Sequence, residues 1–343
     1  VDVATAPDIS CLGWERFSKE ELERQYSPSM WVPLMTTSDV ISLYDTTVQK
    51  DIIEARGFVP WATRTTADGD RKVVMDVYGE DLPGDAPMFV FIHGGYWQYL
   101  NKDMVGGMMG PLYQAGILTL VLSYTIAPEG NIQQMVAEVR SGLQECFKLA
   151  EKRGSSAVVA AGWSAGAQLL LQALSSKGDL AVDKRAPHSR RGAASSQSSA
   201  ANAPSKNSDN IRRLKGIIAI GGVFDLRPLV STYVNDPLKL TSTEAWRLSP
   251  INPQNLEDLV DSVPQDTRIV IAAAEYDSPQ FKLQSVKYAM LLRQGGYSDV
   301  ELQTVAASDH FSIISDLCHH DSFMATITEF IRRCSNDAKH SYA

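Results

Sequence analysis

Gly162-Trp163-Ser164-Ala165-Gly166 matches the pattern G-x-S-x-G and says more about the architecture of this chain than any other stretch. An apolar segment typical of a buried strand, Ala157–Ala161, precedes it, and a segment rich in Ala, Leu and Gln that predicts a helix, Ala165–Ala173, follows it. A serine on a sharp strand-to-helix turn projects from the backbone, where its hydroxyl can attack a carbonyl carbon. Glycines on either side avoid the clashes that side chains would make in so tight a turn. The stretch therefore predicts Ser164 as a nucleophile on an α/β scaffold.

Segments that predict strands alternate with segments that predict helices along most of the chain. The expected strands are short apolar or alternating runs at Lys72–Tyr78, Met88–Ile92, Ile117–Tyr124, Ala157–Ala161, Leu214–Ile220, Arg268–Ala274 and Val300–Val305. The expected helices are Ile132–Lys152, Ala165–Ala173, Phe281–Arg293 and Ser322–Arg333. This order predicts an α/β fold, with a mostly parallel twisted sheet and helices on both faces.

The 343 residues are expected to form one domain, with two segments outside the regular pattern. The N-terminal extension, up to about residue 61, has helical pieces, and Ser18 followed by glutamates predicts a helix N-terminus there. From Asp183 to Asn210 there is no Val, Ile, Leu, Met, Phe, Trp, Tyr or Cys. Such a segment cannot bury enough apolar surface to offset its ordering entropy, so we expect a disordered surface insertion without a catalytic role.

Composition and charge exclude several classes of partner. The chain is 44% hydrophobic and 21% charged, as globular proteins are, and its net charge of −8 argues against a nucleic acid or an anionic membrane as partner. No apolar run approaches the roughly 20 residues of a membrane helix. The first ten residues lack the features of a secretory signal, although the chain does not begin with Met. We therefore expect a small-molecule substrate as the partner, and a homodimer is compatible with the sequence.

The cysteines indicate the compartment. Cys11, Cys146, Cys318 and Cys334 are scattered without C-x-x-C spacing, so a disulfide framework is not expected. A reducing compartment, the cytoplasm, is the expected location.

A second motif, His93-Gly94-Gly95-Tyr96-Trp97, follows the expected strand Met88–Ile92. Two glycines after a strand let backbone N–H groups turn into a cavity, where they can stabilise the oxyanion of a tetrahedral intermediate. A plain glycine turn is the alternative, but the G-x-S-x-G unit downstream favours an oxyanion hole. The expected donors are the amides of Gly94, Gly95 and Ala165.

A serine nucleophile needs a histidine base, and in this fold the base comes last in chain order. The histidines after Ser164 are His188, His310, His319, His320 and His340. His188 lies in the polar insertion and His340 in the C-terminal tail. His319 and His320 are adjacent near the start of the last helix, where their side chains would point about 100° apart. His310 follows the last expected strand by a short loop, where α/β sheets carry their catalytic groups, and is the expected base.

Asp277 is the expected acid, because it follows the strand next to the last one and can reach His310. Asp225, which follows the strand Leu214–Ile220, is the main alternative. Glu275 is a weaker one, because it still belongs to the end of its strand.

Features beyond these residues are less specific. Tyr96, Trp97 and Trp163 flank the two motifs and are expected to line the substrate pocket. No group of residues has metal-ligand spacing, and the pair Gly106-Gly107 lacks the spacing and the lysine of a phosphate loop. We therefore expect no metal and no other cofactor.

The motifs together resemble those of the kynurenine formamidase (arylformamidase) family of α/β-hydrolases. The similar segments are His93–Gln98, Gly162–Gly166, Glu275–Pro279, Asp309–Phe311 and the short motif Gln25–Ser29. The first differs from lipase-like relatives, which have a third glycine, and the insertion 183–210 departs from the family's compact form. The resemblance implies hydrolysis of N-formyl-L-kynurenine to L-kynurenine and formate, in the cytosol and without a cofactor.

Two other functions remain open. The chain could be a general carboxylesterase of the same fold, although Tyr96-Trp97 in place of further glycine argues against this. A formyl group is the smallest acyl group, so it tolerates such bulky neighbours. The chain could also be a binding protein on a hydrolase scaffold without catalysis, but Ser164, Asp277 and His310 at compatible positions argue against that.

Overall fold

The computed structural model describes residues 13–68, 71–175, 211–319 and 322–341, so the polar insertion 183–210 lies outside the described residues. Within these ranges the strands form one sheet in the order β1-β2-β4-β3-β5-β6-β7-β8. The strands are β1 (Trp61–Asp68), β2 (Arg71–Tyr78), β3 (Met88–Ile92), β4 (Leu118–Leu122), β5 (Val158–Trp163), β6 (Leu214–Ile220), β7 (Arg268–Ala274) and β8 (Val300–Val305).

The sheet is parallel from β4 to β8, and β1 and β2 join it as antiparallel strands. The sequence did not predict β1. Its residues are mostly polar, and Trp61 at its start is partly exposed, as an edge strand allows. The strands β3, β4 and β5 are buried along their whole length, which explains their uninterrupted apolar sequences.

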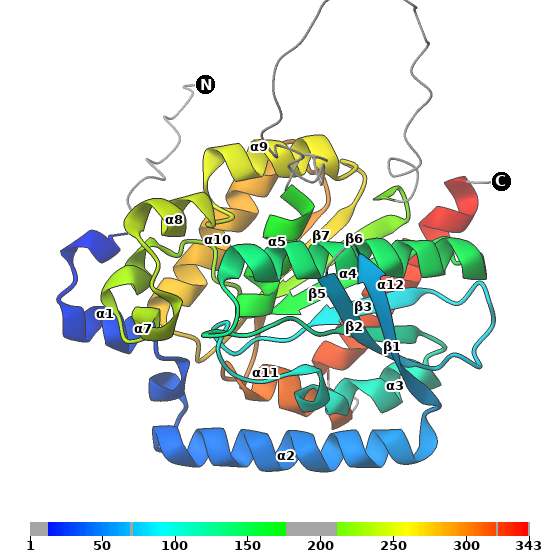
Figure 1. Ribbon diagram of the computed structural model, residues 1–343, viewed down its shortest axis with the longest axis horizontal. Helices are drawn as coiled ribbons and strands as arrows, with labels where there is room; N and C mark the ends of the chain where they lie inside the picture. The colour runs from blue at the N-terminus through cyan, green and yellow to red at the C-terminus, as the bar shows by residue number, and fades with distance from the viewer. Residues whose placement is uncertain (1–12, 69–70, 176–210, 320–321, 342–343) are drawn as a thin grey trace, which may run out of the picture.

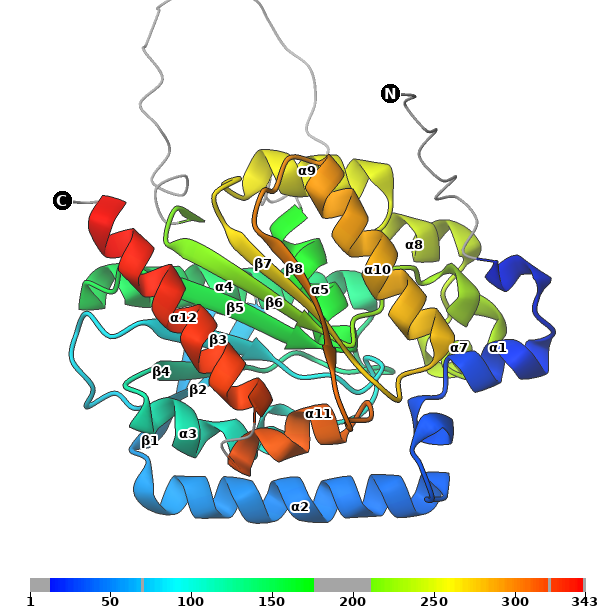
Figure 2. The same ribbon diagram turned by 180° about the vertical axis from the view of Figure 1, so that it is seen from behind.

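Helices cover both faces of the sheet (Figures 1 and 2). Their bounds are α1 (Lys19–Gln25), α2 (Thr37–Phe58), α3 (Met109–Gln114), α4 (Ile132–Arg153), α5 (Ala165–Ser175), α7 (Asn235–Leu238), α8 (Ser242–Arg247), α9 (Pro253–Ser262), α10 (Pro279–Gln294), α11 (Ser312–Ser315) and α12 (Ser322–Ser341). Side chains of α4, α5 and α10 join one hydrophobic cluster against the sheet, and side chains of α2, α3 and α12 join a second. The expected α/β fold with helices on both faces is confirmed.

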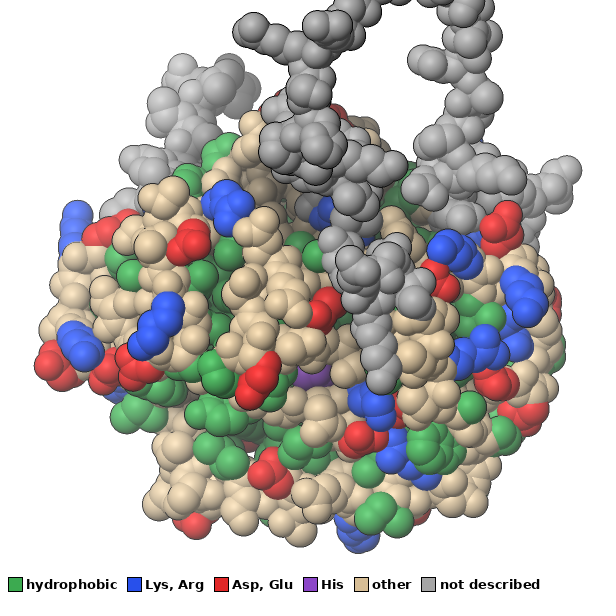
Figure 3. Space-filling view, in the orientation of Figure 1, with side chains coloured by type: hydrophobic (Ala, Val, Ile, Leu, Met, Phe, Trp, Pro, Cys, Tyr) green, Lys and Arg blue, Asp and Glu red, His purple; other side chains and the backbone are tan. Residues whose placement is uncertain are grey.

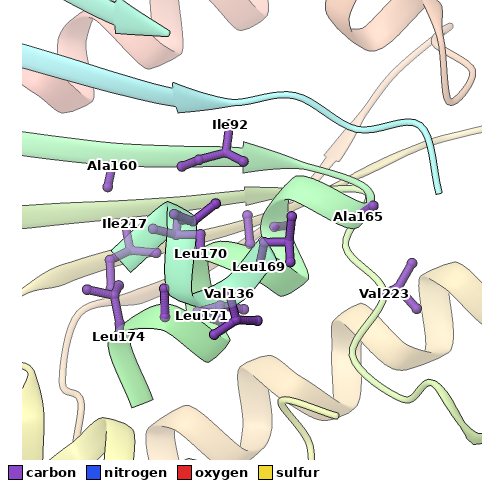
Figure 4. Close-up of a cluster of buried hydrophobic side chains, with 14 of the residues drawn as sticks. Ile92, Val136, Ala160, Ala165, Leu169, Leu170, Leu171, Leu174, Ile217 and Val223 are labelled. Carbon is purple, nitrogen blue, oxygen red and sulfur yellow. The ribbon is translucent and has the colours of Figure 1, made fainter. Parts of the chain in front are cut away.

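Helix α5 holds the centre of the first cluster (Figure 4). All of its residues are buried, because the sheet covers one side and α4 and α9 cover the other. Leu169, Leu170 and Leu171 pack in the cluster that also contains Ile92 of β3 and Ile217 of β6. Truncating such a buried leucine to alanine typically destabilises a protein by about 2–5 kcal/mol. This packing fixes the turn between β5 and α5.

Several of the expected helix ends differ from the structure, most of them by one or two residues. Helix α10 begins at Pro279 rather than Phe281, because the Ser278 side chain accepts a hydrogen bond from the Phe281 amide and a proline suits the first helical position. The last helix continues to Ser341 instead of ending at Arg333, and the buried Ala338 lies on this added part.

The N-terminal segment is attached to the rest of the fold. Ser18 caps α1, as the sequence predicts, by accepting a hydrogen bond from the Glu21 amide. The Gln284 amide of α10 donates to the Tyr26 hydroxyl at 2.9 Å, and the Gln280 backbone N–H donates to Gln25 Oε1 at 3.2 Å. This segment thus reaches the helix that follows Asp277. No helix in the described part of the chain combines the length and apolarity needed to cross a membrane.

Candidate active site

Ser164 lies in the sharp turn between β5 and α5, with a backbone φ of 56°. Its amide donates a 2.7 Å hydrogen bond to the carbonyl of Ile220 at the end of β6, which anchors the turn to the neighbouring strand. The flanking glycines have no room for a side chain. A Cβ at Gly162 would lie 2.4 Å from the Gly166 carbonyl oxygen, and one at Gly166 would lie 2.3 Å from the oxygen of Ile92. The turn therefore requires both glycines of the motif.

Asp277 and His310 form a buried pair at the same edge of the sheet, after β7 and β8. The distance from His310 Nδ1 to Asp277 Oδ1 is 2.7 Å, and Asp277 Oδ2 accepts a 2.9 Å hydrogen bond from the Ala274 amide. The other ring nitrogen, His310 Nε2, is buried without a hydrogen-bond partner. His310 and Ser164 line one pocket, so the structure brings the three predicted catalytic residues together.

Three neighbours fix the position of His310. The Trp163 indole N–H donates to the His310 carbonyl at 3.0 Å, and the Phe281 ring meets the imidazole edge-to-face with centroids 5.0 Å apart. A Cβ at Gly221 would lie 2.9 Å from His310 Cε1, so only glycine leaves room for the ring there. Sequence reasoning missed Gly221 and Phe281, although a glycine directly after a strand was a signal for Gly221.

The two alternative acids are engaged elsewhere. The Asp225 carboxylate is buried and forms an ion pair with Arg227, whose Nη2 lies 2.7 Å from Asp225 Oδ2. The exposed Glu275 accepts a hydrogen bond from the Ala307 amide at 2.7 Å. Neither carboxylate contacts His310, and this geometry favours Asp277 as the acid.

The expected oxyanion donors lie beside the nucleophile. A Cβ at Gly94 would lie 3.1 Å from Ser164 Cβ, which shows how closely the loop after β3 approaches the serine. Among the described residues, the amides of Gly94 and Gly95 have no hydrogen-bond acceptor. Ala165 is the first residue of α5, where amides have no intrahelical acceptor. All three amides therefore remain available to a ligand.

His93, the first residue of the oxyanion motif, stays neutral inside the protein. Its ring stacks on Tyr124 with centroids 4.2 Å apart, and Nδ1 lies 2.9 Å from the Gly94 carbonyl oxygen. Burial lowers the pKa of His93 from 6.5 to about 4. The Tyr124 hydroxyl donates to the carbonyl oxygens of His93 and Gly94 at 3.1 Å. The contacts of His93 and Tyr124 thus hold the backbone of the glycine loop in place.

The pocket at these residues has a volume of about 380 Å³. It is lined by Pro28, Ser29, Ile41, Tyr44, Asp45, Gly95, Tyr96, Tyr99, Leu100, Met104, Trp163, Ser164, Tyr233, His310 and Phe311. In Figure 3 the surface just above α2 is hollowed, and hydrophobic side chains gather around the hollow. Helix α2 supplies part of one wall of the pocket, which no motif in the sequence indicated. Pro28 and Ser29, which belong to the motif Gln25–Ser29, line the pocket as well.

Two of the three expected pocket residues, Tyr96 and Trp163, line this pocket, but Trp97 does not. The Trp97 side chain is fully buried, and its indole N–H donates to Gln168 Oε1 of α5 at 2.9 Å. The expectation for Trp97 is therefore wrong: an aromatic residue beside a motif packs in the core here. The Tyr96 hydroxyl donates to the Tyr26 carbonyl at 2.7 Å, which ties the oxyanion loop to the N-terminal segment.

In the described part of the chain, no group of three or more His, Cys, Asp or Glu side chains is placed so that it could hold a metal ion.

Comparison with curated proteins decides the family. The chain is 35% identical over 315 residues to the kynurenine formamidase of Danio rerio, a match that covers 89% of this chain and 93% of the relative. The chain belongs to the kynurenine formamidase family. The Salmo salar kynurenine formamidase is 33% identical, with 90% of this chain and 94% of that protein covered. The Drosophila melanogaster kynurenine formamidase is 29% identical over 77% of this chain and 78% of its own length. No protein-family model matches the chain.

Solved structures similar to this kynurenine formamidase family member include esterases. A fungal esterase from Rhizomucor miehei superposes with a TM-score of 0.61 at 15% identity, over 88% of this chain and 92% of that one. An esterase from the archaeon Pyrobaculum calidifontis gives a TM-score of 0.60 at 15% identity, over 93% and 97% of the two chains. These likenesses establish the α/β-hydrolase fold.

Proposed function

We propose that this chain hydrolyses N-formyl-L-kynurenine to L-kynurenine and formate, with Ser164 as nucleophile. The observation that carries the proposal is the kinship with kynurenine formamidases over nine tenths of the chain. A buried Asp277–His310 pair and a strained serine turn at one pocket support it.

In the first half of the reaction, Ser164 Oγ attacks the formyl carbon while His310 Nε2 takes the hydroxyl proton. Asp277 holds the imidazole with Nδ1 protonated and stabilises the imidazolium that forms. The carbonyl oxygen becomes an oxyanion that the amides of Ala165 and of Gly94 or Gly95 stabilise. Losing one such donor typically lowers kcat by about 100- to 1000-fold. The C–N bond then breaks, and His310 returns its proton to the departing aromatic amine.

In the second half, water attacks the formyl ester on Ser164. His310 Nε2 takes a proton from this water, and the tetrahedral intermediate collapses to formate. His310 then gives the proton back to Ser164 Oγ, which restores the enzyme. The chain's own residues supply every proton transfer in this scheme.

The pocket suits an aryl formamide. Its volume of about 380 Å³ falls within the usual range for small-molecule sites, roughly 300–1000 Å³. Tyr44, Trp163 and Phe311 provide apolar surface for an aromatic ring, and Tyr96 narrows the space at the oxyanion loop. A formyl group fits beside Tyr96 more easily than a larger acyl group does.

A substrate comparison separates the formamidase from a general carboxylesterase. The purified protein is assayed with N-formyl-L-kynurenine and with p-nitrophenyl acetate, and we expect the higher kcat/KM on the formamide. An equal or higher kcat/KM on the ester, with little turnover of the formamide, would favour the carboxylesterase. Absence of turnover on both substrates would favour a binding protein on a hydrolase scaffold.

The proposed location is the cytosol. Cys146 and Cys334 are free and buried, and burial raises the pKa of the Cys334 thiol to about 12, which keeps it unreactive. Free thiols are compatible with a reducing compartment. Cell fractionation with an activity assay tests this, and recovery of the activity in a membrane or secreted fraction would contradict it.

A further inference from the structure

The described side chains that line the active-site pocket include a negative charge without a lysine or arginine to balance it. Among the described residues that line it, Asp45 is the only carboxylate, and none is a lysine or an arginine. The other titratable group that lines it apart from tyrosines, His310, is already paired with Asp277. The remaining lining residues are mostly aromatic or aliphatic, so one negative charge stands in an apolar surrounding.

Asp45 lies in the N-terminal half of α2 and directly follows Tyr44, which packs this helix against the site. Tyr44 is buried, its hydroxyl donates to the Met104 carbonyl at 3.2 Å, and its ring lies 5.5 Å from that of Trp163. Trp163 in turn holds the backbone of His310. The position of Asp45 is therefore coupled to the catalytic residues through packed rings, although it comes from a distant part of the sequence.

The Asp45 carboxylate is partly buried and has no hydrogen bond or ion pair with any residue that the structure describes. A carboxylate that loses part of its hydration gains from a cationic partner. Attraction between opposite charges also strengthens where apolar walls lower the effective dielectric constant. A cation that enters this pocket therefore meets a carboxylate that no described residue neutralises.

We infer that Asp45 binds the ammonium group of the substrate and selects aryl formamides that carry a cationic amine at the end opposite the formyl group. The assignment of Asp45 rests on the proposed function, since N-formyl-L-kynurenine has an α-ammonium group at that end. When the formyl group lies at Ser164 and the substrate ring packs on the pocket aromatics, the amino-acid end of the substrate points toward the remaining pocket wall. Helix α2, with Asp45, forms part of that wall. Asp45 is thus a specificity-determining residue without a part in bond breaking.

The test compares two substrates in the full-length protein. N-formyl-L-kynurenine carries an α-ammonium and an α-carboxylate group, and 2-formamidoacetophenone is the same aryl formamide without either charge. For Asp45→Asn we expect kcat/KM on N-formyl-L-kynurenine to fall about 10-fold, as for the loss of one charge-assisted hydrogen bond, mainly through KM. On 2-formamidoacetophenone we expect a change below about 2-fold, because this substrate has no charge for Asp45 to bind.

Two further variants serve as controls. Asp45→Glu keeps the negative charge and is expected to recover part of the preference for the charged substrate. Glu54→Gln removes a carboxylate from an exposed position on the same helix, outside the pocket, and should leave both kcat/KM values unchanged. Thermal unfolding midpoints of all variants identify any loss of folding.

The outcomes separate this inference from the function on which it rests. Equal losses on both substrates in Asp45→Asn, or no loss on either, would overturn the role of Asp45 while the formamidase activity stands. If the wild-type protein hydrolyses neither aryl formamide, the proposed function fails and the role of Asp45 fails with it.

Discussion

Replacing Ser164 with alanine is expected to lower kcat on N-formyl-L-kynurenine by at least about 1000-fold. The change removes the only protein atom proposed to bond to the formyl carbon. Substrate binding and the oxyanion donors remain in the variant, and together they give only a small residual rate of hydrolysis. The turn should persist, because its anchors are the Ser164 backbone amide and the two flanking glycines rather than the hydroxyl. Steady-state kinetics, with circular dichroism to verify the fold, measure this effect.

Ser29 offers a matched control for this substitution. It is the other serine that lines the pocket, and it lies in the short helical turn Pro28–Trp31 before α2. Ser29→Ala should change kcat by less than about 3-fold, because Ser29 forms no bond and transfers no proton in the proposed reaction. A Ser164→Ala enzyme that kept a tenth or more of the wild-type kcat would show that another group is the nucleophile.

Replacing Asp277 with asparagine is expected to lower kcat by about 1000- to 10,000-fold. The carboxylate accepts a hydrogen bond from His310 Nδ1 at 2.7 Å and another from the Ala274 amide. An asparagine amide can donate to Nδ1 instead, which would leave the proton on Nε2, where the base must be free to accept one. The imidazolium formed during catalysis would also lose its buried counter-charge. The kcat of the purified variant, measured with its unfolding midpoint, reports this loss.

Asp225→Asn is the matched control for the acid. It also removes a buried carboxylate, but one that pairs with Arg227 rather than with His310. We expect it to lower the free energy of unfolding by about 1–3 kcal/mol, and to leave kcat within about 3-fold of the wild type at a temperature where the variant is folded. A larger loss of kcat in Asp225→Asn than in Asp277→Asn would reverse the choice of acid.

Burial explains which elements of the fold could be predicted from the sequence. Strands β3 and β5 are covered on both faces, so their sequences are apolar throughout and can be recognised without tertiary information. The edge strand β1 has no such signal, because its described side chains are largely exposed to solvent and can therefore be polar. The α/β-hydrolase fold follows from the order of the central elements and does not depend on the edge.

The predicted catalytic residues meet for a topological reason. In a parallel sheet the carboxyl ends of the strands lie at one edge, so residues that follow β5, β7 and β8 converge. Ser164, Asp277 and His310 could therefore be chosen from chain order and from their positions after strands, and their roles stay predictions until the variants are assayed.

The surroundings of these residues could not be chosen in the same way. Phe281 acts on His310 through a tertiary contact that no local pattern records, and the position of Gly221 directly after β6 does not by itself show that His310 packs there. Asp45 lies on a helix that carries no motif, and this helix packs against the site where the Tyr44 ring contacts Trp163. Trp97 shows the opposite case, since its place in a motif suggested a pocket residue and the fold buries it against α5.

Active-site labelling decides whether Ser164 is the nucleophile of this enzyme. The full-length protein is treated with a fluorophosphonate, which reacts irreversibly with activated serines, and the labelled peptide is identified by mass spectrometry while residual N-formyl-L-kynurenine hydrolysis is followed. We predict that the label appears on Ser164, that activity falls in proportion to its occupancy, and that N-formyl-L-kynurenine slows the labelling. Full hydrolysis by protein labelled completely on Ser164, or inactivation with the label on another residue, would contradict the account.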